Sequence, residues 1–150
     1  MSRTSKREAY GRVWFLRREC VSEMSKAKVL IIDDERGFTE MVKLNLEVTG
    51  RYTVFIENES EFALDTVIRI QPDIILLDVI MPHREGPDVV FQLKNHPLAW
   101  DIPVIFLTAT ITKDEAASGC QRVGGHVFLA KPSSVEELIA AIERNLEGEV

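Results

Sequence analysis

From residue 28 onward, short apolar runs alternate with longer amphipathic segments, and the alternation occurs five times before the chain ends. Nearly continuous apolar runs are typical of strands that helices cover on both faces, whereas the longer segments have helical spacing. Alternation of the two predicts βα units and a parallel sheet. The predicted strands are residues 29–32, 53–56, 73–77, 104–107 and 127–130.

The segments between these strands carry helix start signals. Pro87, directly after Gly86, suits the first turn of a helix. Three pairs have the spacing of a capping box: Asn58 with Glu61, Thr112 with Glu115, and Ser134 with Glu137.

Two helices are also predicted from their apolar stripes, which should face the sheet. In the last helix the stripe is Val135, Leu138, Ile139, Ile142 and Leu146. In the first helix it is Phe38, Met41, Val42, Leu46 and Val48, with the polar Asn45 among them.

Five βα units with right-handed crossovers allow only a few strand orders. We expect an α/β fold of the flavodoxin-like (βα)5 type, a doubly wound parallel sheet with strand order 2-1-3-4-5. In such sheets ligands bind beyond the carboxyl ends of the strands, at the switch point between the first and third strands.

A chain of 150 residues suffices for one domain with a substantial core. We expect residues 25–150 to form that domain. Residues 1–24 are predicted to be a disordered extension, because residues 1–23 carry six Lys and Arg against three acids in a chain of net charge −6. The alternative is a basic amphipathic segment that binds a partner or an anionic surface.

Composition and short sequence patterns also argue against several partners and cellular locations. The acidic net charge disfavours a nucleic-acid partner. The apolar run at residues 13–16 is too short for a signal peptide or a membrane span. Cys20 and Cys120 have no metal-site or disulfide-scaffold spacing, which favours a reduced compartment. We therefore predict a cytoplasmic location.

Polar residues end four of the five predicted strands and should meet at one edge of the sheet. They are Asp33 and Asp34, Asp78, Thr108, and Lys131. Carboxylates about 5 Å apart repel each other by about 3 kcal/mol per pair at an effective dielectric of about 20, so positive charge must lie among them. Mg²⁺ suits an all-oxygen site of this kind, and Lys131 supplies a second positive charge.

In this setting Asp78 stays ionised and can act as a carboxylate nucleophile towards phosphorus. The Thr108 hydroxyl and the backbone N–H of Ala109 can donate hydrogen bonds to phosphoryl oxygens.

These segments resemble the receiver domain of bacterial two-component response regulators, over residues 27–148. The matching pieces are residues 31–35 (IIDDE), 77–82 (LDVIMP) followed by Gly86, 107–109 (LTA) and 128–132 (FLAKP). The resemblance implies that Asp78 accepts a phosphoryl group from a histidine kinase or a histidine phosphotransfer protein. Such a protein is a signalling phosphoacceptor that catalyses only its own phosphorylation and dephosphorylation, rather than an enzyme acting on a separate substrate.

The resemblance also implies a role for each site residue. Asp34, Asp78 and the backbone carbonyl of Ile80 would bind Mg²⁺ directly, and Asp33 would act mainly through water. Lys131 would pair with Asp78 or with its phosphoryl oxygens.

Two further sets of residues follow from the same resemblance. Thr108 and Phe128 would form the conformational switch. Ala109 would line the access of the phosphoryl group, while Ile80 and Thr110 would control both access and lifetime. Since Ile80 cannot orient a water molecule, autodephosphorylation should be slower than in relatives with an amide there.

No output domain follows the last predicted helix, so the resemblance favours a stand-alone receiver like the chemotaxis regulators, monomeric or dimerising on phosphorylation. Its downstream protein target would bind the face formed by the helix from Thr112, strand 127–130 and the helix after Ser134. A phosphorelay intermediate is equally open. A receiver-fold binding module that acts without phosphorylation is the alternative function.

Three other classes fit the sequence poorly. A haloacid dehalogenase-type hydrolase needs Asp-x-Asp-x-Thr at its first strand, where this chain has Asp-Asp-Glu-Arg. A P-loop is absent. A flavodoxin would need a hydroxyl-rich phosphate loop where this chain has acids.

Overall fold

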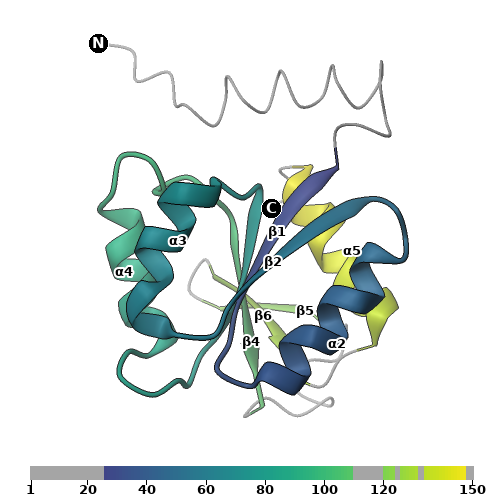
Figure 1. The fold of residues 1–150 in the computed structure, drawn as a ribbon, viewed down its shortest axis with the longest axis horizontal. Helices are drawn as coiled ribbons and strands as arrows, with labels where there is room; N and C mark the ends of the chain where they lie inside the picture. The colour runs from purple at the N-terminus through teal and green to yellow at the C-terminus, as the bar shows by residue number, and fades with distance from the viewer. Residues whose placement is uncertain (1–25, 110–119, 124–125, 132–133, 148–150) are drawn as a thin grey trace.

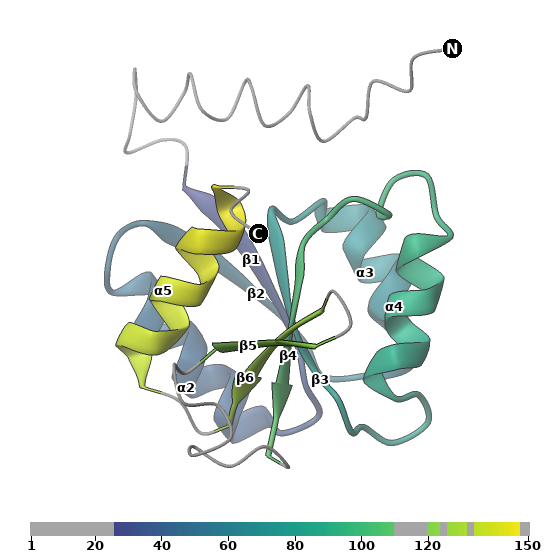
Figure 2. The ribbon, with the colours of Figure 1, turned by 180° about the vertical axis from the view of Figure 1, so that it is seen from behind.

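The structure is a computed structural model that describes residues 26–109, 120–123, 126–131 and 134–147. Within these residues a six-stranded sheet forms the middle layer, with α2 (Arg36–Glu47) and α5 (Val135–Leu146) on one face and α3 (Ala63–Ile70) and α4 (Gly86–Lys94) on the other (Figure 1). The view from behind shows the same three layers (Figure 2). Among the described residues, no helix is long and apolar enough to cross a membrane.

Five strands of the sheet are parallel and lie where the sequence predicts them, with ends that differ by one or two residues. They are β1 (Ala27–Ile32), β2 (Tyr52–Glu57), β3 (Ile74–Asp78), β4 (Val104–Thr108) and β6 (His126–Ala130). Their order is β2-β1-β3-β4-β6, which confirms the predicted order 2-1-3-4-5. The chain passes from one side of β1 to the other between β2 and β3, so the switch point lies between β1 and β3.

The sixth strand of the described sheet, β5 (Cys120–Val123), was not predicted and adds an edge strand to the expected five. It pairs antiparallel with β6 at the edge of the sheet, and Val123 lies opposite His126. The two residues between them are Gly124 and Gly125, a composition typical of a tight hairpin connection. The double glycine thus favours strand pairing here over a helix that runs up to β6. The helix start predicted at Thr112 lies outside the described residues.

The helix start signals have mixed outcomes. Ser134 caps α5 as predicted, because its Oγ accepts a hydrogen bond of 3.1 Å from the backbone N–H of Glu137. Pro87 occupies the first turn of α4, also as predicted.

The capping box at Asn58 is wrong. A short 3-10 turn, η1 (Ser60–Phe62), precedes α3, and neither element has a side-chain cap. The amide of Asn58 donates instead to the carbonyl oxygen of Asp33, because the β2–α3 connection passes beside the end of β1.

Side chains of the central strands alternate between two apolar cores, one under each helix layer. All of them are fully buried: Val29, Ile31, Ile74 and Leu76 face α2 and α5, and Leu30, Ile32, Ile75 and Leu77 face α3 and α4. Burial on both faces explains why these positions are all apolar. It also gives the residues at the strand ends a rigid support.

The predicted stripe of α5 is confirmed, with Leu138 and Ile142 buried. The stripe of α2 is narrower than predicted. Val42 and Leu46 are buried, but Met41 and Val48 are exposed. Met41 lines a pocket between α2 and α5, which leaves part of its side chain open to solvent, and Val48 lies just beyond the last residue of the helix.

Candidate functional site

The carboxyl ends of four parallel strands bring the predicted site residues to one edge of the sheet. Asp33 follows β1 and Asp78 is the last residue of β3, and the two strands are in register with Ile32 opposite Leu77. Thr108 ends β4, opposite Ala130 of β6, and Lys131 comes next in the chain. The topology therefore places acids, a hydroxyl and an amine together at the switch point.

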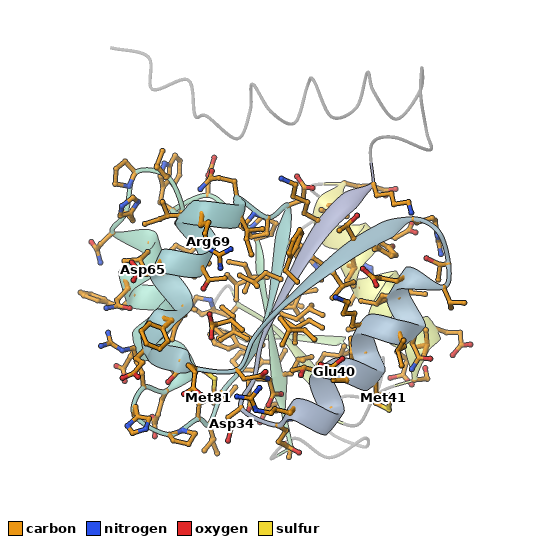
Figure 3. The ribbon with its side chains drawn as sticks, viewed as in Figure 1. Asp34, Glu40, Met41, Asp65, Arg69 and Met81 are labelled. Atoms are coloured by element: carbon orange, nitrogen blue, oxygen red, sulfur yellow. The ribbon has the colours of Figure 1, made fainter. Side chains whose placement is uncertain are left out.

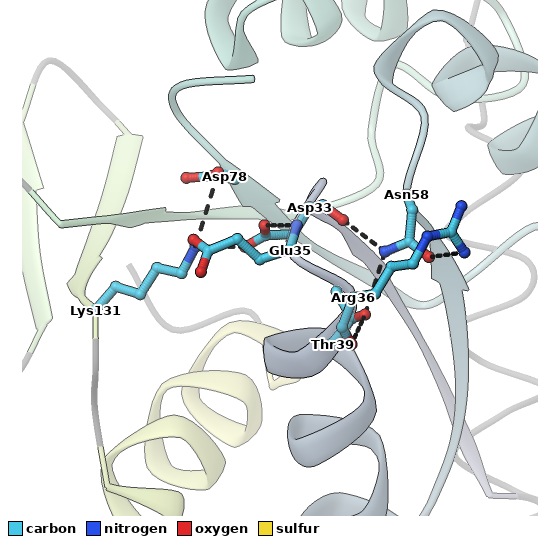
Figure 4. A network of polar contacts seen from close by, with 7 residues as sticks. All are labelled: Asp33, Glu35, Arg36, Thr39, Asn58, Asp78 and Lys131. Carbon is cyan, nitrogen blue, oxygen red and sulfur yellow. Dashed lines mark hydrogen bonds and ion pairs between the residues drawn. The ribbon is translucent and has the colours of Figure 1, made fainter. Parts of the chain in front are cut away.

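Lys131 is the centre of the polar contacts at this edge (Figure 4). Its Nζ lies 2.7 Å from Asp33 Oδ2 and 2.7 Å from Glu35 Oε1, but 3.8 Å from Asp78 Oδ2. The ammonium also lies 4.5 Å from the ring centroid of Phe38, at a distance where the ring attracts a cation. Lys131 is thus bonded to the end of β1 and only approaches Asp78.

Asp33, Glu35 and Asp78 form the acidic group of this site. One carboxylate oxygen from each lies within 4.8 Å of the other two. Asp33 is fully buried and Asp78 is 7% exposed, whereas Glu35 faces solvent. Carboxylate oxygens grouped in this way are ligands that Mg²⁺ prefers, so the donor set fits this ion.

Burial governs the protonation of these groups. Burial, together with the nearby Asp33 carboxylate, raises the pKa of Asp78 to about 6, against the opposing effects of Lys131 and the Ile80 N–H. Burial likewise raises the pKa of Asp33, although the hydrogen bond from Lys131 opposes the shift. Because the three carboxylates share the ammonium of Lys131, the group carries more negative than positive charge.

The pKa of Lys131 also reflects its acidic neighbours. Burial alone lowers the pKa of Lys131, but its hydrogen bonds to Asp33 and Glu35 outweigh burial and raise that pKa. The lysine thus remains charged within the site.

Hydrogen bonds from the β1–α2 and β2–α3 connections hold Asp33 in place. Its Oδ1 accepts a hydrogen bond of 2.9 Å from the Glu35 N–H, and its carbonyl oxygen accepts one of 2.7 Å from the Asn58 amide. Asn58 also contacts Thr39 and Arg36 of α2 (Figure 4). We did not predict this role of Asn58 from the sequence, where its spacing to Glu61 indicated a helix cap instead.

Asp34 lies outside the acidic group, but close enough for its charge to help raise the pKa of Asp78. Its side chain is exposed and lines a pocket with residues of the β2–α3 and β3–α4 connections, among them Asn58, Ser60 and His83. Figure 3 shows Asp34 at the end of the molecule where α2 begins. Of the two adjacent aspartates, Asp33 is the one that lies with Asp78, and Glu35 rather than Asp34 completes the group.

The turn after Asp78 is shaped by Gly86. A Cβ at this position would lie 2.6 Å from the carbonyl oxygen of Asp78 and 3.0 Å from Val79 Cα, and the Gly86 N–H donates to the Val79 carbonyl. A glycine is required because the start of α4 touches the backbone that carries Asp78. Ile80, whose N–H donates to the Asp78 carboxylate, has an exposed side chain.

Thr108 and Phe128 lie on neighbouring strands. Thr108 is buried, and the ring of Phe128 stacks on Phe106 with centroids 5.0 Å apart. The sequence did not point to Phe106 as the partner of Phe128; the register of β4 and β6 places the two opposite each other. Ala109 is exposed just after β4, and Thr110 lies outside the described residues.

Comparison with known proteins points to one family. The family described as the response regulator receiver domain matches residues 29–143. Among solved structures, the chemotaxis protein CheY4 of Vibrio cholerae is 29% identical with a TM-score of 0.67, and the match covers 79% of this chain and 98% of that one.

Two further structures extend this similarity. A putative response regulator from Chloroflexus aurantiacus is 27% identical, with a TM-score of 0.67 and coverage of 83% and 99%. The signal receiver domain of a signal transduction histidine kinase from Syntrophus aciditrophicus is 28% identical, with a TM-score of 0.67 and coverage of 81% and 91%. The chain belongs to the response regulator receiver domain family, the phosphoacceptor modules of two-component signalling.

Proposed function

We propose that Asp78 is the phosphoacceptor of this receiver domain and takes its phosphoryl group from a phosphohistidine of a histidine kinase or a histidine phosphotransfer protein. The observation that carries the proposal is the position of Asp78. It ends a fully buried strand at the switch point of the sheet, is 7% exposed, and has Lys131 Nζ at 3.8 Å. Burial of a carboxylate costs free energy, so its presence in such a place indicates a functional role.

In the proposed reaction a carboxylate oxygen of Asp78 attacks the phosphorus atom of phosphohistidine. An O–P bond forms and the P–N bond breaks; the imidazole nitrogen keeps the electron pair and takes a proton from solvent. Lys131, the Thr108 hydroxyl and the Ala109 N–H are the groups of this edge that would bind the phosphoryl oxygens.

Asp34, Asp78 and the backbone carbonyl of Ile80 would bind Mg²⁺ directly at this edge, and Asp33 would act mainly through water. Glu35 also belongs to the acidic group, but its carboxylate contacts Lys131. When bound, the ion would offset the repulsion between the carboxylates and the incoming phosphoryl oxygens. Besides burial, the charges of Asp33 and Asp34 both raise the pKa of Asp78, which supports a cation among these carboxylates. Removal of Mg²⁺ should therefore prevent phosphorylation.

Thr108 and Phe128 are the proposed switch, and the packing of Phe128 supports it. Phe128 lacks a hydroxyl group, so any movement of its ring must act through packing, first against Phe106 at 5.0 Å. Phosphorylation adds about −1.5 to −2 charges at Asp78, which is large enough to bias such an element.

The proposed surface for a downstream protein includes β6 and the exposed side of α5, where Glu136, Ala140 and Arg144 lie. Glu143 lies elsewhere on α5, since its carboxylate contacts Arg51 and the hydroxyl of Tyr52 near the start of β2. We place the whole domain within residues 25–150.

The proposal is tested with Mg²⁺ and acetyl phosphate, a small phosphoryl donor, and intact-mass measurement. The wild-type protein should gain one acid-stable, base-labile phosphoryl group, and Asp78→Asn should gain none. The matched control is Asp65→Asn, which removes an exposed aspartate of α3 (Figure 3) and should be labelled normally. Equal labelling of Asp78→Asn and wild type would contradict the site. A wild-type protein that is never labelled would favour a binding module that acts without phosphorylation.

The donor is tested separately by phosphotransfer from the histidine kinases and phosphotransfer proteins of the host. A cognate donor should label the wild-type protein faster than the others do, and it should not label Asp78→Asn.

A further inference from the structure

The ammonium of Lys131 is shared unequally among three carboxylates. Asp33 and Glu35 each contact it at 2.7 Å, within hydrogen-bond distance, while Asp78 lies at 3.8 Å. The lysine that a phosphoryl group on Asp78 would need is therefore engaged on the β1 side of the site (Figure 4).

The two close partners differ in how readily they can release the lysine. The Asp33 side chain is fully buried, so loss of its cation would leave a buried charge without compensation. The Glu35 side chain is 62% exposed, and water can solvate its carboxylate when the lysine leaves. Glu35 is the exchangeable partner.

Glu35 is placed in this position by the backbone. Its N–H donates to Asp33 Oδ1 at 2.9 Å, and it is the N-cap residue of α2 with an extended conformation. This local turn directs Asp34 outward and Glu35 back towards Lys131. The contact therefore follows from the way the chain leaves β1.

A phosphoryl group on Asp78 would compete with Glu35 for Lys131. It carries about −1.5 to −2 charges and three strong acceptor oxygens. We propose that Glu35 is a positioning residue that holds Lys131 away from Asp78 in the unphosphorylated protein and must release it for the phosphoryl group to be bound. The inference rests on the proposed role of Asp78 and deepens it, since it names a residue that sets how readily the phosphorylated state forms.

The test compares wild type, Glu35→Gln and Glu35→Asp as full chains, with beryllofluoride as the phosphoryl mimic at saturating Mg²⁺. Glu35→Gln keeps the backbone hydrogen bond and removes the charge. We expect it to bind beryllofluoride about two- to fivefold more tightly, the range that loss of an exposed ion pair allows. Unchanged or weaker binding would overturn the inference.

Glu35→Asp separates the lysine contact from simple charge repulsion. It keeps the negative charge but is one methylene shorter and should no longer reach Lys131 Nζ. If Glu35 acts through the lysine, Glu35→Asp should also bind beryllofluoride more tightly. If Glu35→Asp behaves as wild type while Glu35→Gln binds more tightly, repulsion alone explains the effect and the inference is wrong.

Mg²⁺ affinity without beryllofluoride, measured by calorimetry, supplies a readout independent of the phosphoryl mimic. Glu35→Gln should bind Mg²⁺ within about tenfold of wild type, whereas a larger loss is typical of a removed ligand or its direct support and would overturn the lysine assignment. Glu40→Gln, which removes an exposed charge from the same helix, is the control and should change neither affinity.

Failure of the inference can be distinguished from failure of the proposed function. If wild type binds beryllofluoride and is labelled by acetyl phosphate, Asp78 chemistry stands whatever Glu35→Gln does. If wild type does neither, the proposed function fails first.

Discussion

The interior of β3 and its last residue follow opposite rules, although they are neighbours in one strand. Ile74 to Leu77 are fully buried against apolar side chains of both helix layers, and each contributes to stability. Asp78 is almost as buried, but it lies among like charges and its pKa is raised to about 6. The interior is thus built for stability and the carboxyl edge for chemistry, at a cost in stability. Substitutions in the two regions should have effects of opposite sign.

The largest effect on stability is expected in the interior. Leu76 is fully buried, and Leu76→Ala should lower the free energy of unfolding by about 2–5 kcal/mol, because it removes packed methyl groups and leaves a cavity. Urea denaturation measures this loss. Leu44→Ala, at an exposed position of α2, is the control and should change stability by less than about 0.5 kcal/mol. Similar costs at both positions would remove the distinction between interior and surface.

Gly86 contacts the backbone that carries Asp78, so Gly86→Ala should affect both stability and phosphorylation. The added Cβ would lie 2.6 Å from the Asp78 carbonyl oxygen, so the backbone must shift, at a cost of about 1–3 kcal/mol. Labelling by acetyl phosphate should also slow, because Asp78 moves with its backbone. Gly37→Ala is a matched control: no atom lies within 4 Å of its added Cβ, and a helical alanine should stabilise by up to about 1 kcal/mol. Normal labelling of Gly86→Ala would show that Asp78 tolerates the shift.

At the carboxyl edge of the sheet, substitution should raise the free energy of unfolding instead of lowering it. In Mg²⁺-free protein at pH 7, Asp78→Asn should raise the free energy of unfolding by about 1–3 kcal/mol, since a pKa of about 6 against 3.8 means that the folded state disfavours the ionised carboxyl. The folded protein binds this proton more tightly, so wild-type stability falls as pH rises from about 4 to 6. The gain should therefore be full above pH 6 and vanish near pH 4. Denaturation of both proteins across this range measures it, and a gain that grew as pH fell would contradict the burial argument.

The smallest effect on stability is expected at Ile80, which lies at the exposed border of the site. Ile80 is exposed beside Asp78 and cannot orient an attacking water, so Ile80→Asn should speed the decay of phosphorylated Asp78 with little change in stability. The measurement is the loss of phosphorylated protein over time, by intact mass, after removal of the donor. An unchanged decay rate would mean that the side chain at this position does not control access of water here.

Much of the fold was predictable because it follows from short-range patterns. The five parallel strands are apolar runs whose burial on both faces leaves a clear signal, and right-handed crossovers restrict their order. The edge strand β5 was missed because Cys120–Val123 is short and mixed in polarity, and its main signal was the double glycine that follows. The cap at Asn58 was wrong because a tertiary hydrogen bond to Asp33 replaces the local one.

The sequence by itself determined which residues gather at the carboxyl edge, since strand order and strand ends together bring Asp33, Asp78 and Lys131 to one place. Only the tertiary structure decided how they divide the contacts there. Residue spacing cannot show that Asp34 turns outward while Glu35 turns back to Lys131, because that depends on one hydrogen bond between Asp33 and the next turn of backbone. Nor can spacing show that Lys131 is bonded to the β1 side and stands 3.8 Å from Asp78, because the balance of burial and charge among side chains from three strand ends decides it.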